Sequence, residues 1–200
     1  PGPSGPPARP LTANDLRRLA VVAGLGAVAA VSLGTFMVSA AVGRGVSESA
    51  AGWLQFGGSG TSILARVGSG LWADRRGRTI TMLVSLLSFG AVVFALIPWS
   101  KGAFFTVAVL AAYATGWGWP GLMTASVVGA DREAAAASSA ITQAGVFVGA
   151  GGAPLVLGAV VDRWSFSPMW LVVSACLMAG AGIGWSLVDT RDAAHAGGAL

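Results

Sequence analysis

Long runs of apolar residues, separated by short polar or charged segments, fill the chain after a proline-rich start. A helix needs about 20 apolar residues to cross the roughly 30 Å hydrocarbon core of a bilayer. Six runs are long enough, so the pattern predicts an all-α membrane protein with six transmembrane helices. Their approximate ranges are 19–42, 49–71, 79–97, 103–128, 135–161 and 168–188.

The ends of the chain differ from this apolar pattern. The first eleven residues are rich in proline, which is typical of a disordered linker. Thr12 and Asp15 have the spacing of a capping box at the start of the first helix, with Asp in place of the usual Glu. Because the chain begins at Pro1 rather than Met, we expect it to be part of a longer polypeptide. The predicted divisions are a linker at 1–11, a six-helix bundle at 12–190 and a cytoplasmic tail at 191–200.

Composition supports lipid as the surrounding medium. Hydrophobic residues make up 54% of the 200 residues and charged residues only 10%, whereas a soluble domain carries about 25% charged residues. The net charge of +4 does not indicate nucleic acid, because the basic residues form no patch with interleaved aromatic residues. We therefore expect the lipid bilayer as a partner and no nucleic acid.

The basic residues divide unequally between the two ends of the predicted helices. Cytoplasmic loops carry an excess of Lys and Arg. One side receives Arg9, Arg17, Arg18, Arg66, Arg75, Arg76, Arg78, Arg132 and Arg191, and the other receives Arg44, Lys101 and Arg163. The more basic side holds both termini, so we expect both to be cytoplasmic in a protein of the plasma membrane.

A weak internal repeat relates the first three predicted spans to the last three. Besides matches of small residues, the pairs that lie 88 residues apart are Gln55 and Gln143, Asp74 and Asp162, and Arg75 and Arg163. Each unit contains three spans, an odd number, so the two Asp-Arg pairs are expected on opposite faces of the membrane. This arrangement is a 3+3 inverted repeat, which secondary transporters use to build two gates around a central site.

The loop between the second and third spans has the pattern Gly-x-x-x-Asp-Arg-x-Gly-Arg. Its defined positions are Gly70, Asp74, Arg75, Gly77 and Arg78. The glycine at 77 lets the chain reverse, and the arginines can pair with the aspartate or with anionic lipid headgroups. A short cytoplasmic loop can also favour Gly and Arg without any special role.

This string resembles the signature loop of the major facilitator superfamily, and the resemblance covers about residues 11–190. It implies that Gly70, Asp74, Arg75, Gly77 and Arg78 form a conformational latch. It also implies that the chain is one half of a twelve-span transporter, so the other six-helix half is an expected partner.

The half to which the chain corresponds is predicted from three comparisons with that family. The proline-rich start resembles the linker between the halves, and the fourth span lacks an arginine often found in N-terminal halves. The stretch from Gly149 to Gly158 instead partly resembles an antiporter motif of the N-terminal half, with Ala153 and Leu157 in place of two glycines. We predict the C-terminal half.

Glycine and proline in the fourth and fifth spans predict helix breaks at Pro120 and Pro154, because proline removes a backbone donor. Transporter sites often lie at such interruptions. The family resemblance implies that the first, second, fourth and fifth spans face the cavity. The candidate cavity residues from those spans are Thr35, Gln55, Tyr113, Trp117 and Gln143. The alternative is that glycine and proline only permit packing, and that Trp117 faces lipid.

Ionisable groups are scarce within the predicted spans. Arg66 is the only charge well inside one, and we expect its side chain to extend to the cytoplasmic face. The single histidine, His195, lies in the tail, and no acidic pair occurs within a span, so no catalytic constellation, metal site or cofactor site is predicted. If transport is coupled to protons, the titrating carboxylate is expected in the missing half.

Together these features predict a secondary active transporter that moves a small-molecule substrate, a small organic solute, by alternating access, and not an enzyme. A non-transporting membrane scaffold and a channel-like six-helix protein are the alternatives. A channel would normally carry a polar ring or a re-entrant filter, and the sequence shows neither.

Overall fold

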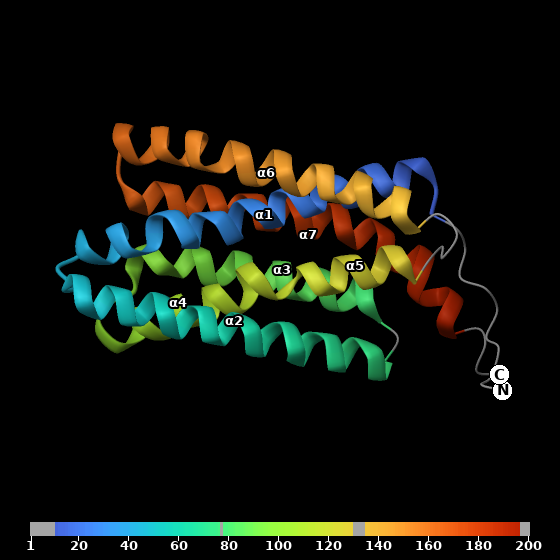
Figure 1. Ribbon diagram of the computed structural model, residues 1–200, viewed down its shortest axis with the longest axis horizontal. Coiled ribbons are helices and arrows are strands. Elements are labelled where there is room, and N and C mark those ends of the chain that lie inside the picture. Colours follow the sequence, from blue (N-terminus) through green and yellow to red (C-terminus); the bar gives the residue numbers. More distant parts are fainter. Residues whose placement is uncertain (1–10, 77, 130–134, 197–200) are drawn as a thin grey trace.

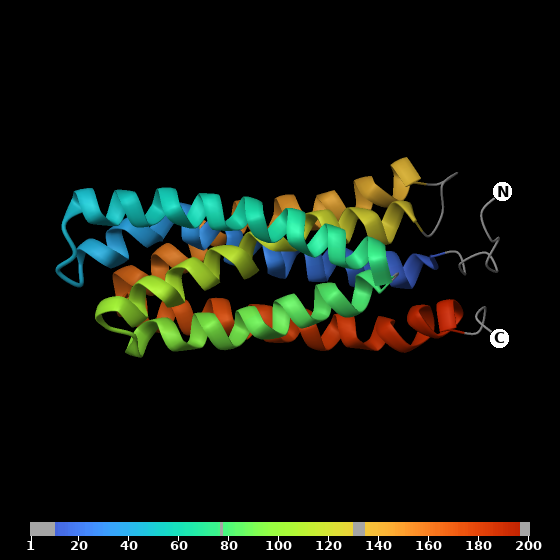
Figure 2. The ribbon, with the colours of Figure 1, turned by 90° about the horizontal axis from the view of Figure 1, so that it is seen from below.

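The computed structural model describes residues 11–76, 78–129 and 135–196, and in these ranges all side chains except those of residues 74, 76 and 189–196. Nearly all of the described residues are helical, and no strand occurs among them. The helices are α1 (Ala13–Val42), α2 (Glu48–Arg76), α3 (Thr79–Leu96), the 3-10 turn η1 (Ile97–Trp99), α4 (Gly102–Gly118), α5 (Pro120–Val128), α6 (Ala135–Arg163) and α7 (Phe166–Ala196). They lie side by side along the long axis of the molecule (Figures 1 and 2).

Four helical segments of the described chain are long and apolar enough to cross a membrane. They are Ala13–Val42, Thr79–Trp99, Ala135–Arg163 and Phe166–Val188. The other two expected spans do not meet this test. The fourth is divided into α4, with 17 residues, and α5, with 9 residues, while α2 contains many glycines and serines together with Gln55 and Arg66.

The structure describes both the start of the first helix and the end of the last one. The capping box at the start of α1 is confirmed: the Thr12 hydroxyl accepts from the Asp15 N–H at 3.2 Å, and the Asp15 carboxylate accepts from the Thr12 N–H at 3.0 Å. Toward the C-terminus, α7 continues to Ala196, beyond the boundary expected at residue 190. Of the linker expected at 1–11, residues 1–10 lie outside the described residues.

The core of the bundle lies among α1, α3, α4 and α7. Its largest buried side chains include Leu33, Met37, Leu87, Phe94, Trp170 and Leu177. Helix α1 packs against α6 and α7, α4 packs against α2 and α3, and α3 packs against α7. Helices α2 and α6 contribute few residues to this core, and both expose large apolar side chains.

The helix connections gather at two ends of the bundle (Figure 1). The start of α1, the end of α2 and the end of α7 lie at one end, which we call the α7 end. The α1–α2 turn, η1 and the α6–α7 turn lie at the other, which we call the η1 end. Asp74 lies near the end of α2 and Asp162 near the end of α6, so the backbone positions of these two residues are at opposite ends of the bundle.

The expected helix break at Pro154 is absent. Helix α6 is continuous from Ala135 to Arg163 with Pro154 inside it. Proline removes only one backbone donor, and a transmembrane helix tolerates this loss where the rest of its backbone hydrogen bonds remain. The proline at 154 therefore does not create an interruption at which a substrate could bind.

Candidate functional site

Helices α4 and α5 together form the fourth rod of the bundle, which corresponds to the fourth predicted span. This rod is interrupted at Trp119, between Gly118, the last residue of α4, and Pro120, the first residue of α5. Because Pro120 has no N–H, it cannot donate to the carbonyl of Gly116 four residues earlier. The indole Nε1 of Trp119 donates to that carbonyl oxygen at 2.9 Å. A buried side chain next to the proline thus replaces the donor that the proline lacks.

Helix α2 supplies donors to the next two carbonyls of the break. The Nε of Arg66 donates to the Trp117 carbonyl at 2.7 Å. The buried hydroxyl of Ser69 lies 3.3 Å from the Gly118 carbonyl oxygen and 3.2 Å from that of Arg66. An unpaired backbone group costs several kcal/mol in hydrocarbon. These side chains therefore make the break compatible with membrane depth.

Arg66 does not follow the prediction that it would extend to the cytoplasmic face. Its guanidinium carbon lies 5.2 Å from the centre of the Trp117 ring, in a cation–π contact, while its Nε holds the Trp117 carbonyl. The position of an arginine in a span fixes its depth, but the partner across the helix interface decides where the guanidinium goes. That partner could not be recognised from the sequence.

A cavity of about 420 Å³ adjoins the break and is lined by α1, α2, α4, α5 and α6. This volume lies within the range of small-molecule sites. Its polar lining residues are Arg66, Thr124, Ser139, Thr142 and Gln143. Its larger apolar lining residues are Trp117, Trp119, Met123 and Val146. The combination of aromatic walls with a few polar groups is suited to an organic molecule that carries one polar end.

The five predicted cavity residues fall in different places. Trp117 and Gln143 line the 420 Å³ cavity. Tyr113 and Gln55 instead bond to each other, the tyrosine hydroxyl donating to the Gln55 Oε1 and lying 3.4 Å from the Leu33 carbonyl oxygen. This pair connects α4, α2 and α1. Thr35 is exposed on α1 and does not line the 420 Å³ cavity.

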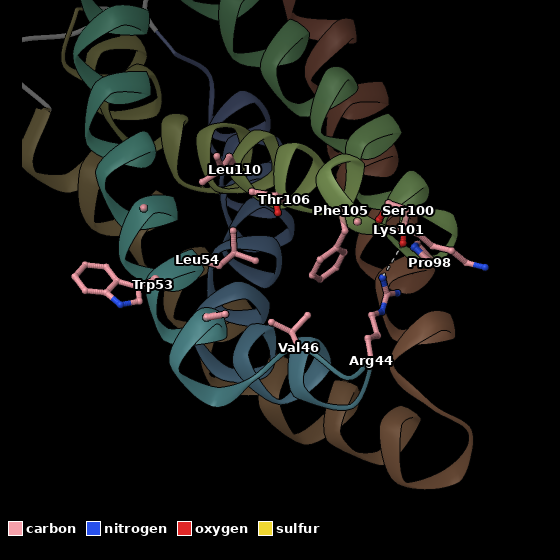
Figure 3. Close-up of a pocket in the computed structure, with 13 residues that line it drawn as sticks. Arg44, Val46, Trp53, Leu54, Pro98, Ser100, Lys101, Phe105, Thr106 and Leu110 are labelled. Atoms are coloured by element: carbon pink, nitrogen blue, oxygen red, sulfur yellow. Dashed lines mark hydrogen bonds between the residues drawn. The ribbon is translucent and has the colours of Figure 1, made fainter.

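A larger cavity, of about 910 Å³, lies at the η1 end between α2, α4 and the loops (Figure 3). Its lining includes Arg44 and Lys101 beside the apolar Trp53, Leu54 and Phe105. Burial lowers the pKa of the Arg44 guanidinium from its ordinary value.

Arg44 has structural partners in this larger cavity. Its Nη1 donates to the Ile97 carbonyl at 2.9 Å, and its guanidinium carbon lies 4.8 Å from the centre of the Phe105 ring. No residue of this cavity was predicted as part of a site. The carbonyl that Arg44 binds lies 53 residues later in the chain, so the pairing is not visible in the sequence.

Those of the predicted latch residues that the structure describes lie at the α7 end, where α2 is followed by α3. Gly70 is within α2, with open space where a Cβ would lie, and the side chains of Arg75 and Arg78 are exposed. Gly77 and the side chain of Asp74 lie outside the described residues. The pairing of Asp74 with arginine therefore stays a prediction.

Comparison of the chain with protein-family models gave no match, and neither did comparison with curated proteins. The resemblance to the major facilitator superfamily therefore depends on sequence features alone, chiefly the loop from Gly70 to Arg78 and the internal repeat. The described structure is that of an all-helical protein with four helices suited to crossing a membrane.

Proposed function

We propose that this chain is one six-helix half of a secondary transporter that moves a small organic solute by alternating access. Helix α2 and the rod formed by α4 and α5 do not meet the test that the other four spans meet, but both are long enough to cross the membrane and complete a set of six transmembrane segments. The fourth rod, α4 with α5, runs over residues 102–128. With a rise of about 1.5 Å per helical residue it is about 40 Å long, and the bilayer core is about 30 Å thick. The side-chain donors at the break support the placement of this rod in lipid.

The packing of the helices is the observation that carries the proposal. In a 3+3 repeat, α1 corresponds to α4 with α5, α2 to α6, and α3 to α7. The pair α1–α6 then corresponds to α4–α2, the pair α1–α7 to α4–α3, and α3–α7 to itself. All of these pairs are in contact. The correspondence between these helix pairs supports two oppositely oriented three-helix units. The positions of residues 74 and 162 at opposite ends of the bundle support the same arrangement.

The exposed faces of α2 and α6 support a missing partner. These equivalent helices carry exposed large apolar side chains, including Trp53, Phe56 and Leu64 on α2 and Phe147, Val148 and Leu155 on α6. In the proposal a second six-helix bundle covers part of these faces, and lipid covers the rest. The loop from Gly70 to Arg78 then acts as a latch to that bundle on the cytoplasmic side of the plasma membrane, and the chain is the C-terminal half.

Cysteine labelling of the full-length protein tests alternating access. The native Cys176 is first replaced by serine, and a single cysteine is introduced in place of Thr35 or of the cavity residue Ser139. Each is labelled with a membrane-impermeant thiol reagent applied from one side. A transported solute should raise labelling at one position and lower it at the other. Simultaneous labelling of both, unaffected by solute, would favour a channel, and no solute response at either would favour a scaffold.

The latch is tested in the same background by Asp74→Ala. Loss of the latch should lower labelling from the outside at position 35 and raise labelling from the cytoplasm at position 139. The matched control is Asp162→Ala, which removes the equivalent carboxylate from the opposite end of the repeat and should not reproduce this change. Transport and labelling that are unchanged in Asp74→Ala would contradict the latch.

A further inference from the structure

We propose that the cavity beside the helix break, of about 420 Å³, binds the carboxylate of a small organic acid, with Arg66 as its cationic partner. This inference rests on the proposed transport function and names the class of substrate. Among the described residues that line the cavity, Arg66 is the only charged one. It lies ten residues before Arg76, the last residue of α2. This separation corresponds to about 15 Å along a helix. A charge at such depth in a membrane protein normally marks a ligand or ion pathway.

The hydrogen bonds of Arg66 leave most of its guanidinium available. An arginine has five N–H groups and does not lose its proton in proteins. Toward the described residues, only the Nε–H of Arg66 is used, by the Trp117 carbonyl. Within the part of the chain that the structure describes, no carboxylate forms an ion pair with this guanidinium. The two terminal nitrogens therefore carry positive charge beside a cavity in which the described residues supply no counter-ion.

The geometry of the guanidinium selects the ligand. Two parallel N–H groups of arginine match the two oxygens of a carboxylate. The half-buried ring of Trp117 lies in the same cavity and offers apolar surface for the rest of the molecule, whereas Trp119 is almost fully buried. On the facing helix, α6, Gln143 and Ser139 add hydrogen-bonding groups. A monocarboxylic acid with a small apolar or hydroxylated body fits both the charge and the volume.

The same guanidinium would connect the ligand to the helix break. Its Nε holds the Trp117 carbonyl, and in the proposal its terminal nitrogens bind the carboxylate. Because the group is planar and rigid, a ligand that orients it also fixes the donor to the break. Lysine keeps the charge but lacks the two parallel N–H groups of arginine, so Arg66→Lys should retain only part of the carboxylate binding.

Binding to the full-length protein in lipid nanodiscs tests the assignment. The probes are lactate and benzoate, each compared with its uncharged primary amide, and inorganic phosphate. Binding is measured by the ligand-dependent rise in unfolding temperature. At least one acid should bind about tenfold or more tightly than its amide, a difference of about 1.4 kcal/mol. Equal binding of acid and amide, stabilisation by phosphate alone, or no stabilisation by either acid would overturn the inference.

Variants then assign the effect to the cavity. Arg66→Gln retains an N–H that can reach the Trp117 carbonyl, and it should weaken acid binding about tenfold without changing amide binding. Gln143→Leu, which leaves the break untouched, should weaken acid binding less. The matched control is Lys101→Gln, which removes a cation from the larger cavity and should have no effect. Undiminished acid binding in both cavity variants would overturn the inference, while reciprocal cysteine labelling would still support transport.

Discussion

At the crossing of α1 with α6 two backbones meet directly, whereas at the crossing of α4 with α2 an aromatic ring lies between the helices. A Cβ on Gly24 would lie 2.8 Å from the Gly145 carbonyl oxygen, and a Cβ on Gly149 would overlap the Gly24 carbonyl. On the other side, a Cβ on Gly58 would overlap the ring of Tyr113. The two crossings occupy equivalent places in the proposed repeat, yet their contacts are of different kinds.

The difference separates a packing role from a chemical role. Between transmembrane helices, small residues allow close approach and van der Waals contact, since lipid supplies little hydrophobic driving force. The α1–α6 crossing depends on this close approach. The side of the molecule built from α2 and α4 carries the polar contacts, which are those of Tyr113 with Gln55, Arg66 with Trp117 and Ser69 with Gly118. A repeat can therefore keep its helix arrangement while only one crossing acquires functional groups.

Gly149→Val should cause the largest loss of stability. The added side chain would meet backbone of α1, which no rotamer change can move. We expect a loss of about 3 kcal/mol in the free energy of unfolding, at the upper end for overpacking, measured by denaturant titration in detergent. The control is Gly151→Val on the same helix, where a Cβ meets open space. Equal stability of the two variants would contradict the close crossing.

Gly58→Val should cause a smaller loss, of about 2 kcal/mol, because the obstacle is a side chain. Displacement of the Tyr113 ring would also break its hydrogen bond to Gln55. Adding Tyr113→Leu should recover part of the stability, so the two substitutions should be non-additive. Unfolding of both single variants and the double variant measures this coupling. Strict additivity would show that the Tyr113 ring is not the obstacle to a side chain at position 58. In contrast, truncating a neighbouring side chain should not restore the stability of Gly149→Val, because its obstacle is backbone.

Tyr113→Phe should lower the free energy of unfolding by about 1 kcal/mol, since it removes one hydrogen bond and leaves the Gln55 amide oxygen without this donor. Gln55→Leu in the Tyr113→Phe background should recover part of this loss, because both polar partners are then absent. The measurement is the same titration. An unchanged stability in Tyr113→Phe would indicate that the hydroxyl does not hold α4 to α2.

Ser69→Ala should have the smallest effect, about 0.6 kcal/mol, the average of hydrogen bonds between transmembrane helices. It removes the donor to the Gly118 carbonyl at the break. Ser59→Ala is the control, because the Ser59 hydroxyl donates to the Gln55 carbonyl within α2. Hydrogen exchange at the N–H of Met123, which donates to the Trp119 carbonyl at the break, should rise in Ser69→Ala and not in Ser59→Ala. Equal exchange in the two variants would remove Ser69 from the break.

Parts of the fold were predictable because they depend on neighbours in sequence. The start of α1 follows from the local spacing of Thr12 and Asp15, which needs no tertiary contact. The positions of the apolar helices α1, α3, α6 and α7 follow from length and hydropathy alone. Helix α2 is harder to assign to the membrane, because its glycines, serines and Arg66 dilute the apolar signal.

The two prolines show where sequence reasoning reaches its limit. Both lie in glycine-containing stretches and were expected to break their helices. The helix ends before Pro120 but continues through Pro154. At the first, the Trp119 indole and the α2 side chains Arg66 and Ser69 satisfy the carbonyls that the interruption frees. Two of these three donors come from α2, far earlier in the chain, so no local pattern could reveal them.

By itself, the sequence determined that the chain is helical and that at least four of its helices suit a bilayer. It also determined the positions of the glycines that allow the close helix crossing and of Arg66 within α2. Tertiary structure decided that Arg66 faces the break and its cavity rather than the membrane surface, and that Tyr113 binds Gln55 across a crossing. The physical reason is that hydropathy and capping act over a few residues, whereas a hydrogen bond between helices depends on which faces meet.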